Sequence, residues 1–447
     1  MRSYKVATET ITALVAALVA GLALTLPIDF GWTSQSSALQ LDLLAYSLPR
    51  AISAGVLIAM IVAVLITTMG SPSVAWSTTV GGLLVLVANH TLGHAGDPNA
   101  SLSTMNFIDS LSGGVILGAL GAAVLHHRLP SFAWTLGILI SLLLGSVNPV
   151  PRVGGGSITD NLKDHWHASD IPPMWMVVLA FALAVVSLLI NRKGPAAQRL
   201  SIELPLAPIL AGTLMVLITL FSAEWLARHG GSVAGIVLAV VTSVGTAMIA
   251  SMLLPGRDGE IVLIAVGVGA VGAATIAAEM PAWSIPLLVA VSAFGMWAGS
   301  QVSAPMPALW LSMLVGVSTA FTADTAKAWL IVGSAALVSW LLGFGLLAAR
   351  PRYVPSRVLG TSILFVPSAV LGMRDYVARG DYAMLSGNSG MCTVSSGSTA
   401  TPGWTSVLVA GGCLAGMFLL RRLRPLPVPS AAAATPPEGS SNGGTAD

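Results

Sequence analysis

The chain is built from roughly fourteen apolar stretches, and its Lys and Arg residues fall mostly in every second gap between them. A helix that crosses the hydrocarbon core of a bilayer, about 30 Å thick, needs about 20 apolar residues. Short cytoplasmic loops collect Lys and Arg, so the alternation also predicts orientation. The sequence therefore predicts an all-α, polytopic membrane protein with about 14 transmembrane helices.

The expected orientation places the N-terminus in the cytoplasm, because most of the 20 basic residues then lie on that side. An even number of spans also returns the C-terminus to the cytoplasm. We expect a multi-pass protein of a bacterial inner (plasma) membrane, with the lipid bilayer as its partner. The expected spans are 8–28, 50–70, 73–92, 107–126, 131–147, 173–191, 204–226, 231–254, 260–279, 283–302, 305–322, 327–349, 356–373 and 403–420.

Composition excludes most other classes of protein. Apolar residues make up 55% of the chain and charged residues 9%, too few charges to keep a soluble surface of this size in water. The formal net charge of +2 gives no reason to expect nucleic-acid binding. Cys392 and Cys413 do not have the spacing of metal ligands, so we expect neither a metal nor a cofactor.

The order of spans and linkers predicts four segments. Residues 1–192 form a six-helix bundle, and residues 193–257 form a basic cytoplasmic linker with two extra spans. Residues 258–424 form a second six-helix bundle. Residues 425–447 are rich in Pro, Ala, Ser and Gly and are expected to be a disordered cytoplasmic tail, because they cannot bury enough apolar surface to fold.

Two stretches carry a family resemblance. The fourth span reads Asp109-Ser-Leu-Ser-Gly113, and the fifth ends Gly145-Ser-Val-Asn-Pro149-Val-Pro-Arg-Val-Gly154-Gly155. With six spans, a basic linker and eight more spans, the chain resembles the fourteen-span, drug:proton antiporter branch of the major facilitator superfamily. The matched positions, which are structural, are Gly113, Gly145, Pro149, Gly154 and Gly155.

The resemblance implies two six-helix bundles around a central path, with alternating access to the two sides of the membrane. The chain departs from the family at Asp109, where the family has Arg, and in the loop Gly70–Trp76, which lacks the family's charges. Its composition, rich in Ala, Val and Gly, also suggests an actinobacterial source.

Ionisable groups inside a bilayer are costly and are usually functional. Asp29, Asp109, Glu224 and Glu279 lie at or near the outer ends of expected spans and are candidates for loading a proton or lining a cavity. The alternative is that topology alone places these acids at the outer interface. For Glu224, Arg228 lies one helical turn away and favours that alternative.

The largest polar concentration is the expected outer loop 148–172, which contains Arg152, His165 and His167. No spacing in it matches a zinc signature, and a solvated loop is the simpler interpretation. If the protein has an external recognition surface, this loop is the candidate.

Small residues and proline inside the spans predict packing features. Gly114-x-x-x-Gly118 predicts close approach of two helices. The Gly267-x-Gly269-x-x-Gly272 run also predicts packing, because it lies in mid-span without the strand that a dinucleotide site needs. Four prolines in or near the spans, Pro149, Pro208, Pro286 and Pro367, predict kinks or an opened backbone at a ligand site.

The spans contain almost no fixed charge, which favours a secondary transporter or exporter of a lipid or another apolar or amphipathic small molecule, and not an enzyme. One alternative is a non-transporting scaffold subunit of an envelope-assembly complex, with unknown protein partners. Another is a polyprenyl-phosphate-dependent glycosyltransferase with Asp29 or Asp42 as its base.

Overall fold

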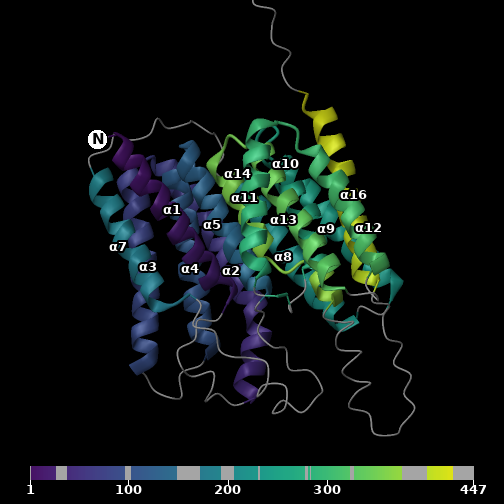
Figure 1. Cartoon of the computed structure of the whole chain (residues 1–447), viewed down its shortest axis with the longest axis horizontal. Coiled ribbons are helices and arrows are strands. Elements are labelled where there is room, and N and C mark those ends of the chain that lie inside the picture. Colours follow the sequence, from purple (N-terminus) through teal and green to yellow (C-terminus); the bar gives the residue numbers. More distant parts are fainter. Residues whose placement is uncertain are drawn as a thin grey trace, which may run out of the picture.

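The computed structural model describes residues 2–26, 38–95, 102–147, 172–192, 206–229, 232–276, 280–281, 283–322, 327–374 and 400–425. Within these ranges the chain forms fourteen labelled α-helices, one 3₁₀ helix and a further helical segment at 369–374, without any strand. The helices lie side by side in one bundle (Figure 1). An all-α fold is therefore confirmed. The expected tail 425–447 lies outside the described residues, except for its first residue.

Each of the fourteen expected spans overlaps one helix. The first six helices are α1 (Arg2–Thr25), α2 (Ala38–Met69), α3 (Pro72–Ala95), α4 (Leu102–Val124), α5 (Arg128–Val147) and α7 (Met174–Asn191). The next four are α8 (Leu206–His229), α9 (Val233–Leu253), α10 (Glu260–Thr275) and α11 (Ser284–Gln301). The last are α12 (Met306–Thr322), α13 (Ala328–Ala348), α14 (Val354–Ser362) with the 3₁₀ helix η1 (Ile363–Phe365), and α16 (Thr401–Leu423).

Eleven helical segments are long and apolar enough to cross a membrane by length and composition. They include the broken segment Val354–Arg374, which contains α14 and η1. Two shorter apolar helices, α10 and α12, have 16 and 17 residues. An α-helix pairs its own backbone N–H and C=O groups, which is necessary in the hydrocarbon core of a bilayer because no water is available there. The chain is therefore a multi-pass membrane protein.

The two largest differences from the expected spans are in helices that contain or precede a proline. Helix α2 begins at Ala38 instead of about residue 50 and continues through Pro49, where the Ser53 hydroxyl donates to the Pro49 carbonyl. In contrast, the segment after α14 breaks at Val366, whose φ of −69° and ψ of 132° are extended. The residue before a proline is pushed out of the helical region, so Pro367 explains the break.

Two sets of six helices pack in the same way. We call α1–α5 with α7 the N-half, and α10–α14 with α16 the C-half. In the N-half, α1 packs on α4, α5 and α7, α4 packs on α2 and α3, and α3 packs on α7. In the C-half, α10 packs on α13, α14 and α16, α13 packs on α11 and α12, and α12 packs on α16. The same six pairings therefore occur in both halves.

Glycines allow the tightest crossing in each half. A Cβ atom added at Gly114 of α4 would collide with the backbone of Gly55 on α2, and one added at Gly118 would collide with Ala59. In the C-half, the corresponding helices α11 and α13 cross so closely that a Cβ at Gly295 or Gly299 would collide with backbone of α13. Helices in lipid associate through such close backbone approach.

The halves meet where α2 packs on α14 and where α5 packs on α11, and these are the central helices in Figure 1. Helix α4 also touches α14. Of the two remaining helices, α8 packs on α2 of the N-half and on α14 of the C-half. Helix α9 packs on α8 and on α16 and α10 of the C-half. The exact limits of the four expected segments stay a prediction.

We expect Gly114→Ala to destabilise the protein by about 1–3 kcal/mol, because the added methyl group forces α4 away from α2. The matched control is Gly81→Ala on α3, where an added Cβ meets nothing within 4 Å. Thermal unfolding in detergent, followed by tryptophan fluorescence, measures the difference. Equal unfolding temperatures for the two variants would contradict the close crossing.

Candidate functional site

Charged and polar side chains gather at the end of the bundle where α1 begins and α16 ends. We call it the basic end, and it includes the loops 125–127, 254–259 and 349–353 and the last turn of α16. Arg424 of this turn donates to the carbonyls of Leu254 and Gly256, and Arg257 donates back to the Arg424 carbonyl. These contacts tie the end of α9 to the end of α16.

Asp258 organises the loop that precedes α14. Its two carboxylate oxygens accept hydrogen bonds from the backbone N–H groups of Arg352, at 3.0 Å, and of Tyr353, at 2.7 Å. Burial raises the pKa of Asp258, and the two backbone donors oppose that shift by favouring the carboxylate. The bonds set the position at which α14 begins.

Arg357, one turn into α14, joins the C-half to the N-half. Its Nη1 lies 2.8 Å from Oγ of Ser131 on α5 and 3.5 Å from the carbonyl oxygen of Leu125, which follows α4. Its Nε donates to the Pro351 carbonyl at 3.1 Å. We call Arg357, Ser131 and Leu125 the latch, because separation of the halves at the basic end breaks these contacts.

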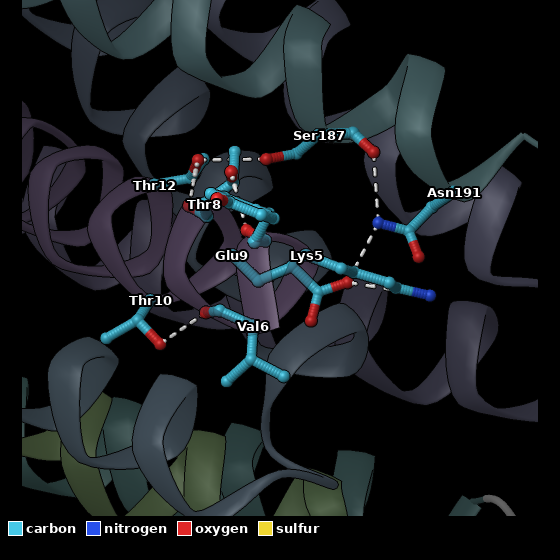
Figure 2. A network of polar contacts seen from close by, with 9 residues as sticks. Lys5, Val6, Thr8, Glu9, Thr10, Thr12, Ser187 and Asn191 are labelled. Carbon is cyan, nitrogen blue, oxygen red and sulfur yellow. Dashed lines mark hydrogen bonds and ion pairs between the residues drawn. The ribbon is translucent and has the colours of Figure 1, made fainter. Parts of the chain in front are cut away.

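Each half also has a buried acid that joins its first helix to its sixth. In the N-half, Oε1 of Glu9 on α1 accepts from Nδ2 of Asn191 on α7 at 2.9 Å, and Lys5 lies 3.9 Å away (Figure 2). In the C-half, both oxygens of Glu260 on α10 accept from Arg421 on α16, at 2.8 and 2.9 Å.

These two contacts join equivalent pairs of helices. Helices α1 and α7 pair in the N-half as α10 and α16 pair in the C-half. One turn further in, the hydroxyls of Thr12 and Ser187 lie 2.9 Å apart and continue the N-half contact, as Figure 2 shows. The two halves therefore resemble each other both in the packing of their helices and in the polar contact between their first and sixth helices.

A second polar group lies in the N-half, toward the opposite end. Asp109 on α4 is fully buried, and its Oδ1 accepts from Nδ2 of Asn89 on α3 at 2.7 Å. Asn89 also donates to the Met105 carbonyl, so its amide spans one turn of α4. Asn106 and Ser110, on the same helix, are buried as well. We call Asn106, Asp109 and Ser110 the α4 polar group.

Of the four acids singled out in the sequence, two lie in the described residues. Asp109 is in the α4 polar group. Glu224 on α8 forms an ion pair with Arg50 of α2, with Oε1 and Nε 2.9 Å apart, and so fastens α8 to the N-half. The structure does not bring Glu224 and Asp109 into contact. The residues outside the described ranges are Asp29, Glu279, Arg152, His165, His167, Pro149, Gly154 and Gly155.

The remaining predicted positions are in helix contacts. A Cβ at Gly113 would collide with the Ala20 carbonyl of α1, and one at Gly145 would press on Thr25. Gly267 packs against Leu309 and Cys413, as expected for a packing run. Asp42 lies in α2, but its side chain is outside the described atoms.

Sequence reasoning missed Glu9, Glu260, Asp258 and Arg357. All four lie near span ends, where charge is expected from topology alone. The one available signal was the pair of acids near the starts of the first and ninth spans, which are equivalent helices in the two halves. Among the described residues, no group of three or more His, Cys, Asp or Glu side chains is placed to hold a metal ion.

No protein-family model and no curated protein match the chain. One solved structure to which it aligns is described as showing the selectivity mechanism of a bacterial homologue of the human drug peptide transporters PepT1 and PepT2. The alignment covers 94% of this chain and 99% of that chain, with a TM-score of 0.41 and 15% sequence identity. At this level of similarity it decides neither the fold nor the function.

The two buried acids give contrasting predictions. Glu260→Gln leaves the Arg421 guanidinium without its charged partner, and we expect a loss of about 1–3 kcal/mol of stability. Glu9→Gln keeps an oxygen that accepts from Asn191, so its cost is expected to be smaller. Thermal or denaturant unfolding of both variants in detergent measures the contrast. A larger loss for Glu9→Gln would mean that charge, and not hydrogen bonding, holds α1 to α7.

Proposed function

We propose that the chain is a secondary transporter or exporter of the major facilitator type, which moves an apolar or amphipathic small molecule or lipid across the plasma membrane. The observation that carries the proposal is the matched packing of the N-half and the C-half. Carriers of this kind are built from two repeats, and alternating access is largely a rocking of one repeat against the other.

The junction between the halves supports such a movement. At the basic end it is closed by the polar latch, whose two contacts between the halves both come from the Arg357 side chain. Twelve residues after Ser131 along α5, Leu143 lies in an apolar cluster with Leu288 of α11 and Ile276, which follows α10. A polar closure at one end and an apolar closure at the other allow each end to open separately.

The distribution of charge supports the nature of the cargo. Charged side chains within the described spans are mostly engaged with other protein groups, as Glu9, Arg50, Glu224, Arg357 and Glu260 show. A cargo of high charge needs free counter-charges along its path. We therefore favour a neutral, zwitterionic or amphipathic cargo, moved at the expense of an ion gradient.

The basic end is the cytoplasmic side in this proposal, because the loops and helix ends there carry most of the described Lys and Arg residues. Both termini then lie in the cytoplasm. The latch therefore closes the cytoplasmic entrance, and the carrier releases it when that side opens.

Spin labels test the proposed movement without knowledge of the cargo. In a Cys392→Ser/Cys413→Ala background, labels replace His127 of the N-half and Arg352 of the C-half, both exposed at the basic end. Pulsed dipolar spectroscopy in lipid nanodiscs is expected to show two distance populations. Arg357→Ala, which removes the latch, is expected to increase the longer one at least twofold.

Two controls make the result specific. Labels at His127 and Arg192 lie within the N-half, so their single distance is expected to stay unchanged. Arg422→Ala removes an exposed arginine of the same end and is expected to leave the populations as they were. A single His127–Arg352 distance that does not respond to Arg357→Ala would contradict the carrier and favour the scaffold.

A further inference from the structure

The α4 polar group contains buried atoms with no hydrogen-bond partner among the described residues. They are Oδ2 of Asp109, Oδ1 and Nδ2 of Asn106 and Oγ of Ser110. Asp109 and Ser110 are 0% exposed, and Asn106 is 1% exposed. Buried polar groups in proteins are nearly always paired, and an unpaired carboxylate in a membrane span is especially costly. Something other than the described side chains must satisfy these atoms.

The three side chains share one face of α4. Asn106 is three residues before Asp109 and four before Ser110, and both spacings make side chains neighbours on a helix. Asn89 holds Oδ1 of Asp109 from the α3 side, so Oδ2 is the carboxylate oxygen that lacks a partner. The group therefore offers three oxygens from adjacent turns: a carboxylate, an amide carbonyl and a hydroxyl.

The end of α1 lies beside this group. A Cβ at Gly113, one turn from Ser110, would touch the Leu24 side chain, and α1 ends at Thr25. A Cβ at Gly55 of α2 would meet both the Leu24 side chain and the Ser110 carbonyl, so the last turn of α1 lies close to Ser110. The C-terminal end of a helix carries partial negative charge and favours a cation. Ends of broken or terminating helices hold sodium in this way in other membrane carriers.

We propose that the α4 polar group binds one dehydrated sodium ion. Oxygen donors of this kind suit a hard cation, and the single carboxylate balances a single positive charge, whereas a divalent ion would leave excess charge in the bilayer. The amide of Asn106 contributes its oxygen, and Asn89 keeps the carboxylate oriented.

In the proposed carrier, sodium is the ion whose gradient drives transport. This role of the site rests on the proposed function. Binding of the ion itself does not depend on transport. The site therefore has its own test on the purified, full-length protein in detergent.

The experiment measures unfolding temperature and equilibrium binding of radioactive ²²Na⁺ at constant ionic strength, with choline replacing sodium. We expect a saturable rise in unfolding temperature with NaCl and one ion bound per chain. Asp109→Asn is expected to abolish both effects. Asn106→Ala is expected to raise the apparent Kd by about tenfold or more, as loss of a group around a bound ion typically does.

Ser339→Ala is the matched control. Ser339 lies on α13, the packing counterpart of α4, and its hydroxyl is likewise buried and without a partner among the described residues. Its loss is expected to leave sodium binding unchanged, whereas Ser110→Ala weakens it. Equal stabilisation by potassium or choline, or binding that persists in Asp109→Asn, would overturn the site. So would the absence of any sodium effect, which would mean that Asp109 is neutral because it carries a proton.

The two proposals fail separately. If sodium does not bind but the distance between His127 and Arg352 still has two populations, the carrier stands and the ion site is wrong. If sodium binds and the halves show one fixed arrangement, the site is real and the transport function is wrong.

Discussion

Inside a bilayer no water is available for a polar group, so each must be satisfied by another part of the protein. This constraint organises the whole chain. It forces the backbone into helices, and it explains why Glu9 and Glu260 are bonded to the helices beside them. The break at Pro367 lies in a segment that is largely buried within the protein, away from lipid. The same constraint makes the unpaired atoms around Asp109 informative, because they bring a carboxylate, an amide and a hydroxyl together on one helix.

The second determinant of the architecture is the close approach of helix backbones to one another. Lipid tails are as apolar as leucine, so helices in a membrane are not driven together by exclusion from water. Gly55 and Gly114 allow α2 and α4 to meet at the backbone, and Gly299 does the same for α11 and α13. Each half is therefore rigid at its tightest crossing. The junction between the halves depends instead on side chains, chiefly Arg357 and an apolar cluster, which are easier to separate.

Hydropathy alone located all fourteen helices, because a span must be both long and apolar. It did not locate their ends, since α2 continues through Pro49 whereas the segment at Pro367 breaks, and the two prolines look alike in the sequence. Asp109 was found because a lone acid in a span is unusual. Asn106 and Ser110 were missed because neutral polar residues are common in spans. Arg357 was missed because its charge was already explained by topology, and its contact with Ser131 joins segments 226 residues apart.

The central claim is that two rigid halves of like packing move against each other. Its most direct test is to determine structures in lipid nanodiscs by electron cryo-microscopy, with particles sorted by conformation. The account predicts at least two classes in which the N-half and the C-half each superpose as rigid units while the angle between them changes and the Arg357–Ser131 contact is broken in one class. A single arrangement, or changes confined within one half, would contradict it.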